Sequence, residues 1–173
     1  MTFESLLSAA VVLQQNIDSH GESLTKSARE IYESLNSKLK LEEDSFTDSH
    51  GQNVQKLNIS IFDHEASNYV RYKEQSTFNI NSGVFDFAIM FNFPVNAGGD
   101  DYMTISADIQ VRYDDNERQF RLMDRSTGHT SDWEKDFNLF CNSILKWIRI
   151  QLTFNPYYGY HKRPTMKWLT LDI

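Results

Sequence analysis

Length, composition and charge already exclude several classes of protein. The chain has 173 residues, and 24 acidic against 17 basic side chains give a formal charge of -7 at pH 7. That balance disfavours nonspecific nucleic-acid binding, which depends on Lys and Arg neutralising phosphates. An aromatic content of 13% indicates a packed core rather than disorder. We therefore expect a single α+β domain over residues 1–173.

Cysteine content and the N-terminal residues bear on location. The single cysteine, Cys141, cannot form an internal disulfide, so a reducing cytoplasm is expected. The apolar patch from Leu6 to Leu13 is short and interrupted by Ser8, and no basic residue precedes it, which argues against a signal peptide. No apolar run approaches the roughly 20 residues that span a bilayer, so no membrane partner is expected.

Two amphipathic helices are predicted in residues 1–40, folded as a helical hairpin. The first is expected to end at His20-Gly21, and the second runs from about Ser23 to Lys40. The apolar stripe of the second helix is also typical of a coiled-coil seam that binds another chain, but it spans barely two heptads, so we favour packing onto the sheet. The apolar positions are Phe3, Leu6, Leu7, Ala10, Leu13 or Gln14, and Ile17 in the first helix, then Leu24, Ala28, Ile31, Leu35 and Leu39 in the second.

The region between the helices and the main sheet is expected to begin as a connector. Residues 41–53 are polar and rich in turn formers. Leu57, Ile59 and Ile61 then alternate with polar residues, which predicts a first strand. Residues 69–73 and 78–81 are weaker strand candidates that could form one bent edge hairpin.

An antiparallel meander is predicted between Val84 and Asp124, because apolar and polar residues alternate there over three runs. Turn-forming residues separate the runs at 96–100 and at 115–116. The register is constrained, since a slip by one residue would move every apolar side chain to the wrong face. The predicted pairs are Val111 with Phe120, Ile109 with Leu122, Gln110 with Arg121, Phe91 with Ile105, Ile89 with Ala107, and Asp86 with Gln110.

A long C-terminal helix is predicted over residues 131–153 as the cover of the sheet. Ser131 and Glu134 have the spacing of a capping box. The apolar face is expected to carry Trp133, Phe137, Phe140, Cys141, Ile144, Ile148 and Leu152. The complete fold prediction is α+β, with an N-terminal helical hairpin, an antiparallel β-meander sheet of four to six strands within residues 54–124, and this helix packed on one sheet face. Residues 154–173 are expected to be an irregular basic and aromatic tail, with a possible last strand at 167–173.

Most of the common catalytic signatures are missing from the sequence. There is no glycine-rich phosphate loop, no G-x-S-x-G elbow and no H-E-x-x-H motif, and the five histidines lack ligand spacing. No metal and no cofactor are therefore predicted, and the sequence leans against an enzyme. Cys141 could act as a nucleophile beside a histidine, but its place between Phe140 and Ile144 favours a buried core residue.

The polar face of the predicted sheet is one candidate site. Carboxylates on neighbouring strands could bind a metal or exchange protons. The alternative is that they are solvated or paired with the nearby arginines, as cross-strand charges commonly are, and we favour this structural interpretation. The residues on this face are Asp86, Asp108, Gln110, Arg112 and Arg121.

The C-terminal segment is a second candidate site, because residues 138–173 hold five basic side chains and one acid. Aromatic rings mixed with positive charge suit stacking on exposed bases, and they equally suit a protein interface. Packing against the domain is the third interpretation and the one we favour. The cluster consists of Tyr157, Tyr158, Tyr160, His161, Lys162, Arg163 and Trp168.

The function expected from these patterns is a non-enzymatic cytosolic protein-interaction module, such as an inhibitor, an immunity-type protein or an assembly subunit. The acidic, aromatic and motif-poor chain favours a protein partner. One alternative is an enzyme or small-ligand-binding domain that uses the polar sheet face. The other is nucleic-acid binding through the basic and aromatic C-terminal segment.

Overall fold

Two helices and eight strands make up the described part of the chain. The computed structural model describes residues 3–41, 43–63, 68–71, 83–95, 102–114 and 117–153. Strands β1 and β2 pair with each other, and the other six form one antiparallel sheet in the order β4-β3-β5-β6-β7-β8. The α+β prediction is confirmed. The elements are α1 (Phe3–Leu39), β1 (Ser45–Thr47), β2 (Asn53–Gln55), β3 (Leu57–Asp63), β4 (Asn68–Arg71), β5 (Val84–Pro94), β6 (Tyr102–Asp114), β7 (Glu117–Asp124), β8 (His129–Thr130) and α2 (Phe137–Thr153).

The meander of β5, β6 and β7 has the register that the alternation predicts. Phe91 lies opposite Ile105 in β6, and Val111 lies opposite Phe120 in β7. All six predicted pairs are confirmed. This agreement follows from a core on one side of the sheet, which penalises any register that turns the apolar residues outward.

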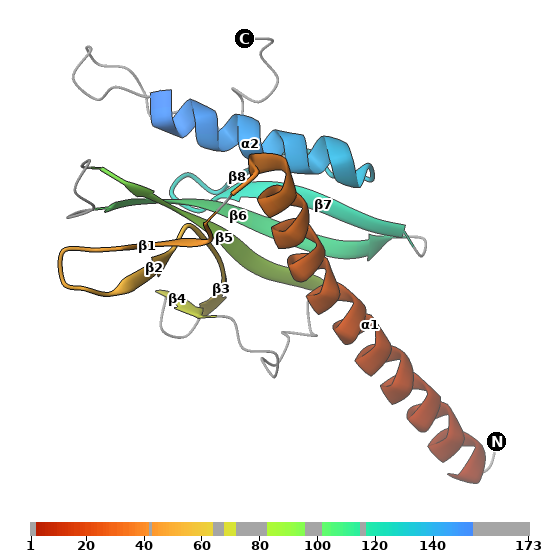
Figure 1. Cartoon of the computed structure of the whole chain (residues 1–173). Helices are drawn as coiled ribbons and strands as arrows, with labels where there is room; N and C mark the ends of the chain where they lie inside the picture. Colours follow the sequence, from red (N-terminus) through yellow and green to blue (C-terminus); the bar gives the residue numbers. More distant parts are fainter. Residues whose placement is uncertain are drawn as a thin grey trace.

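Both helices cover the apolar face of the sheet. Figure 1 shows α2 lying along the sheet, and the ring of Phe140 stacks on Phe120 of β7 with centroids 5.2 Å apart. The C-terminal half of α1 contacts β3, β5 and β6. Its stripe packs internally, as favoured from the sequence: Leu24, Ala28, Ile31 and Leu35 are buried, and Leu39 is partly exposed.

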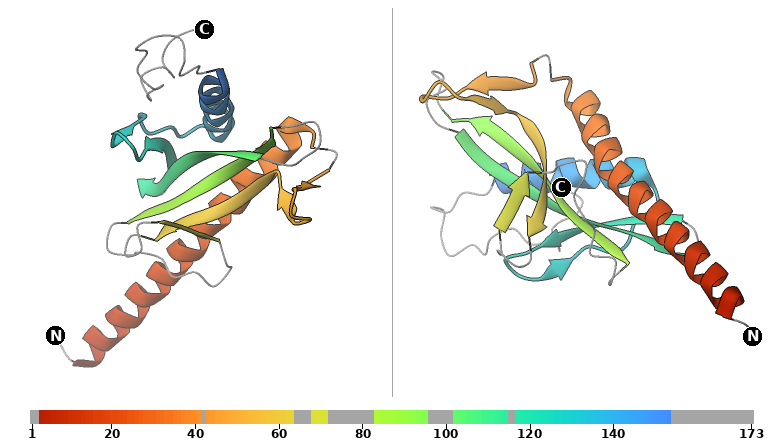
Figure 2. Two further views of the ribbon diagram at one scale, coloured as in Figure 1. Left: turned by 90° about the vertical axis from the view of Figure 1, so that its left-hand side faces the viewer. Right: turned by 90° about the horizontal axis from the view of Figure 1, so that it is seen from below.

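The predicted helical hairpin is wrong, because α1 is one continuous helix from Phe3 to Leu39. Figures 1 and 2 show it as a single rod whose N-terminal part extends beyond the sheet. Gly21 lies inside the helix and is buried. A single glycine costs a helix only about 1 kcal/mol relative to alanine, and no proline occurs before Pro94 to stop it.

The predicted connector at residues 41–53 instead holds the first strand and the turn of a small hairpin, whose second strand begins at Asn53. Phe46 of β1 pairs with Val54 of β2, and the Phe46 ring meets Tyr102 edge-on at 5.9 Å. In the turn, Oδ1 of Asp48 accepts hydrogen bonds from the backbone of His50 at 2.9 Å and of Gln52 at 2.8 Å. Each strand has one apolar residue, so alternation could not reveal it.

The other strand predictions fare differently. The first strand is confirmed as β3, and the weaker candidate at 69–73 overlaps β4, which lies at the sheet edge as expected. The candidate at 78–81 and the possible last strand at 167–173 lie outside the described residues.

Helix α2 begins at Phe137, six residues after the predicted start. Asp136 caps it, because its Oδ1 accepts hydrogen bonds from the backbone of Asn138 at 2.8 Å and of Leu139 at 2.9 Å. The predicted cap residue Ser131 instead accepts a bond at 3.0 Å from the backbone of Leu122. The chain from β8 to Glu134 therefore continues along β7. The buried residues of α2 are Phe140, Cys141, Ile144, Trp147, Ile148 and Ile150, whereas Leu152 is exposed.

Cys141 is a core residue, as favoured from the sequence. Its side chain has no exposed surface, and burial raises the pKa of the thiol. We therefore expect the native protein to react with iodoacetamide far more slowly than the denatured protein, because the thiolate is the reactive species. Mass spectrometry of alkylated samples across a urea series tests this. Rapid labelling without denaturant would contradict it.

Candidate functional site

The five residues predicted on the polar face of the sheet lie on that face. Asp86 of β5, Gln110 of β6 and Arg121 of β7 form one cross-strand row. Arg112 lies two residues after Gln110 in β6, opposite Gln119, and Asp108 lies two residues before Gln110. The face is less open than the alternation suggested, since Asp108 is only 6% exposed.

Trp133 lies against the arginines of this face, which the sequence did not reveal. The guanidinium carbons of Arg112 and Arg121 are 4.2 and 4.3 Å from the centre of the Trp133 ring. Trp133 was predicted on the apolar face of the last helix, and this is wrong because residues 131–134 run beside β7. Burial lowers the pKa of Arg121, the charge of Arg112 lowers it further, and the charge of Asp86 opposes both effects.

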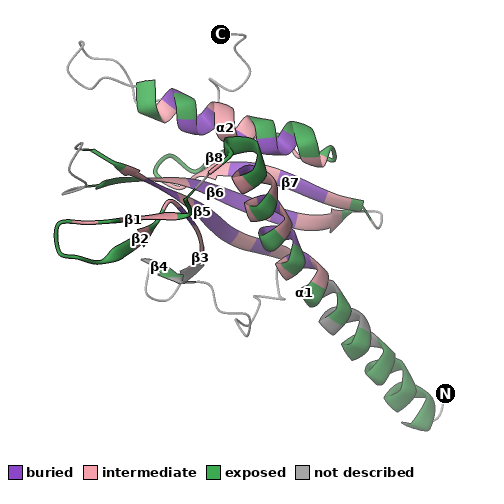
Figure 3. Cartoon of the chain, in the orientation of Figure 1, coloured by how far each residue is buried: buried purple, intermediate pink, exposed green. Residues whose placement is uncertain are grey.

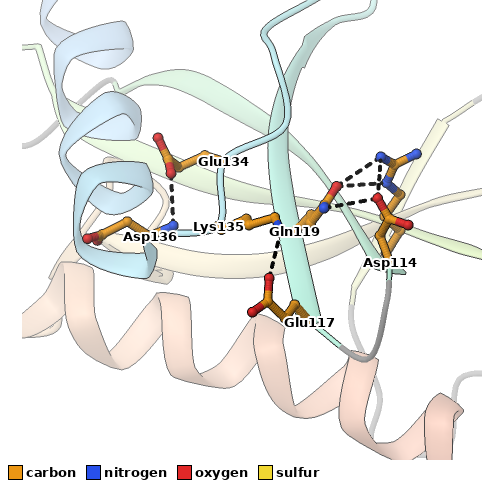
Figure 4. Close-up of polar contacts among 7 residues, drawn as sticks. Asp114, Glu117, Gln119, Glu134, Lys135 and Asp136 are labelled. Atoms are coloured by element: carbon orange, nitrogen blue, oxygen red, sulfur yellow. Dashed lines mark hydrogen bonds and ion pairs between the residues drawn. The ribbon is translucent and has the colours of Figure 1, made fainter.

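Neutral and acidic side chains hold the two arginines in place. Oε1 of Gln119 accepts hydrogen bonds from Nε of Arg112 at 3.1 Å and from Nη2 at 2.9 Å. Nε2 of Gln119 donates to Asp114 at 3.1 Å, a contact visible in Figure 4. Gln110 accepts a bond at 2.7 Å from Nε of Arg121. The glutamine side chains that accept hydrogen bonds from these two guanidinium groups thus belong to strands of the sheet.

The same region fixes the chain ahead of α2. Lys135 forms an ion pair with Glu117 at 2.7 Å, and Figure 4 shows this pair beside the contact of Glu134 with the backbone of Asp136. The two side chains of the ion pair are 60% and 61% exposed, so its contribution to stability is small.

Asp108 has a partner that the sequence analysis missed, Arg125 in the turn after β7. Nε of Arg125 lies 2.8 Å from Oδ1 of Asp108, and the two side chains are 20% and 9% exposed. Burial raises the pKa of Asp108, and the hydrogen bond and charge of Arg125 only partly offset that rise. Arg125 follows the strand in sequence, so period-two reasoning could not place it on this face.

The raised pKa of Asp108 predicts a pH dependence of folding stability. The folded state holds this proton more tightly than the unfolded state, so the stabilisation is complete below the ordinary value of 3.8 and is lost as pH rises through the folded pKa. Relative to Asp108→Asn, the wild-type protein should therefore lose stability as pH rises through that window. Urea unfolding of both proteins from acid to neutral pH measures this. The prediction would be contradicted if the stability difference between the two proteins stayed constant as pH rises, or if it changed in favour of the wild type.

These contacts are what a structural role of the polar face requires. Among the described residues, no group of three or more His, Cys, Asp or Glu side chains is arranged to hold a metal ion. A ligand-binding role of the face remains a prediction. The C-terminal cluster from Tyr157 to Trp168 lies outside the described residues.

The projecting part of α1 is a second surface, and it is the larger departure from expectation. We call residues 4–19 of α1 the arm. Every arm side chain that the structure describes is exposed, as the green colour in Figure 3 shows. Four large apolar side chains are at least half exposed: Leu6 at 52%, Leu7 at 56%, Val11 at 50% and Val12 at 55%. The sequence has no charged residue from Ser5 to Ile17.

A polar anchor fixes α1 to the sheet where the arm ends. Arg118 of β7 donates hydrogen bonds from Nη1 to Oγ of Ser27 at 3.0 Å and to Oε2 of Glu30 at 2.6 Å. The hydroxyl groups of Ser23 and Tyr113 are also hydrogen-bonded to each other. Ser27 is fully buried. The anchor sets the direction of the helix, so the arm projects from a fixed base.

Comparisons with known proteins found no match to this chain: no protein-family model, no curated protein and no solved structure matches it. Among the described helices, none is both long and apolar enough to cross a membrane.

Proposed function

We propose that this chain is a non-enzymatic protein-interaction module that binds a protein partner through the arm. The observation that carries the proposal is the exposure of Leu6, Leu7, Val11 and Val12 on a helix that continues past the sheet. Clustered apolar side chains of this kind are typical of interaction sites on soluble proteins. An amphipathic helix that lays its apolar side into a partner is a recurring mode of recognition.

The energetics of the arm support binding. Burying the exposed half of each of the four large side chains contributes about 1 kcal/mol per residue. An isolated helix of about 12–15 residues is only marginally stable in water, and the arm side chains that the structure describes are exposed rather than packed in the core. A partner would supply both the missing burial and the missing helix stabilisation.

The remainder of the molecule supports the same function. The polar face has internal partners for Asp108, Arg112 and Arg121, as a structural role would require. The arm side chains that the structure describes, by contrast, are exposed and are not part of the hydrophobic core, whose described α1 members begin at Leu24. Exposed apolar side chains that do not pack in the core are available to a partner.

Affinity purification from the native host tests this function. The full chain is compared with an arm variant, Leu6→Lys with Leu7→Lys, and with a matched variant, Leu139→Lys with Leu152→Lys, whose two leucines are 55% and 44% exposed on α2. We expect a stoichiometric protein with the wild type and the α2 variant and its loss with the arm variant. Retention by the arm variant, or loss only with the α2 variant, would contradict the proposal.

A further inference from the structure

We propose that the protein partner of the arm is a second copy of this chain, and that two arms pair in antiparallel orientation. The inference rests on the proposed function and names the partner. It is carried by the exposure of the described arm side chains, the heptad spacing of the arm sequence, its uncharged stretch from Ser5 to Ile17 and the charge of the body that holds it.

The spacing of apolar residues along the arm is self-complementary. In the sequence they recur at intervals of three and four, which is the pattern of a coiled-coil seam. Leu6 is on this seam, and the seam positions are Phe3, Leu6, Ala10, Leu13 and Ile17. Two copies of this sequence pattern match each other in antiparallel register, in which Leu6 is opposite Ile17 and the small Ala10 is opposite the larger Leu13.

Charge distinguishes a second copy from other partners. The thirteen positions from Ser5 to Ile17 carry no charged residue, and the two acids of the arm, Glu4 and Asp18, lie at its ends. The central stretches of two arms therefore meet without repulsion and without side chains that would select an oppositely charged partner. A heterologous partner of opposite charge would find nothing on the seam to pair with.

The orientation follows from the net charge of -7 on each chain. Parallel arms would place two acidic bodies at the same end of the pair. Antiparallel arms place them at opposite ends of a segment about 24 Å long, at 1.5 Å per residue, which exceeds the screening length of about 8 Å at physiological salt. Antiparallel helix dipoles add a small contribution in the same direction.

The length of the seam sets the expected strength. Stable coiled coils usually have three or four heptads, and the arm has little more than two. The pair is therefore expected to dissociate on dilution within the micromolar range and to reform on concentration.

Sedimentation equilibrium of the purified full chain over a concentration series tests the pairing. We expect the apparent molecular mass to rise with protein concentration from that of one chain to that of two chains. Leu6→Lys should weaken association at least 10-fold, whereas Leu139→Lys should associate as the wild type does. Leu139 is the matched control, because it is 55% exposed against 52% for Leu6 and lies on α2, outside the arm.

Engineered cysteines test the orientation, since the native Cys141 is buried. Leu6→Cys alone should form no disulfide dimer, and a mixture of Leu6→Cys with Ile17→Cys should form one, because antiparallel arms bring the two ends of the seam together. A disulfide dimer of Leu6→Cys alone would overturn the antiparallel arrangement.

Three results would overturn self-pairing. The first is a monomer at every concentration, and the second is equal weakening by Leu6→Lys and Leu139→Lys. The third is arm-dependent binding to phosphatidylcholine vesicles by a chain that stays monomeric in solution. A monomer whose arm variant still loses a different host protein would overturn self-pairing and leave the proposed function standing. If no association of any kind depends on the arm, both are wrong.

Discussion

Replacing Phe120 by alanine is expected to lower the free energy of unfolding by about 3–5 kcal/mol. The side chain is 1% exposed, and its ring stacks on Phe140 at 5.2 Å and meets Phe137 edge-on at 5.7 Å. It thereby joins β7 to α2. Removing it leaves a cavity between two layers that cannot close without moving the helix, so both transfer free energy and packing are lost.

Phe46→Ala is the matched control for this change. Phe46 is only half-buried in the β1–β2 hairpin and is absent from the core cluster, so we expect a cost of about 1 kcal/mol. Urea unfolding followed by tryptophan fluorescence measures both variants. Equal losses for the two would contradict the assignment of Phe120 to the centre of the core.

Breaking the pair between Asp108 and Arg125 from one side should cost more than replacing both partners. Arg125→Met leaves the carboxylate of Asp108 buried without its cation, and we expect a loss of about 3 kcal/mol. Asp108→Leu should cost less, because Arg125 is the more exposed partner and can reach water. The double variant should be less destabilised than Arg125→Met, since no uncompensated buried charge remains.

A double-mutant cycle at neutral pH measures this coupling, and repetition at acid pH separates its cause. The loss in Arg125→Met should shrink as pH falls, because Asp108 then binds a proton. Lys135→Met serves as the exposed control and should cost less than about 1 kcal/mol. Strictly additive losses in the cycle would show that the pair at 2.8 Å contributes no coupling.

The sheet register could be predicted from the sequence because one physical constraint dominates it. In β5, β6 and β7 the apolar residues occupy one face, and the core makes any slip costly. The alternation of Ile89, Ala107 and Ile109 was therefore sufficient. Hairpin β1–β2 escaped prediction because Phe46 and Val54 give it only one apolar pair.

Helix boundaries could not be predicted because competing local signals had similar strength. Gly21 is typical of a helix end, yet α1 continues through it and is held beyond it by the contacts of Arg118. Ser131 and Glu134 have capping-box spacing, but Asp136 caps α2 and Glu134 instead exchanges two 2.8 Å backbone bonds with Phe120. Contacts with the sheet therefore outweighed the local signals both at Gly21 in α1 and at the start of α2.

Prediction of the candidate sites was limited in the same way, because tertiary contacts are not visible in local sequence patterns. The polar face was predicted from alternation, but its contacts with Trp133 and Arg125 depend on segments outside the meander. The apolar residues of the arm were visible in the sequence. Their exposure was not, because it follows from α1 being one helix rather than a hairpin.

Hydrogen exchange along α1 tests most directly whether the arm is a binding surface that another copy covers. Amides of residues 4–19 should exchange rapidly in dilute protein, since an uncovered helix frays, and they should become protected as concentration rises. Amides between Leu24 and Leu35 should stay protected throughout, because that half of α1 packs in the core. Protection of the arm that does not change with concentration, in the wild type and in Leu6→Lys alike, would contradict the pairing of two arms.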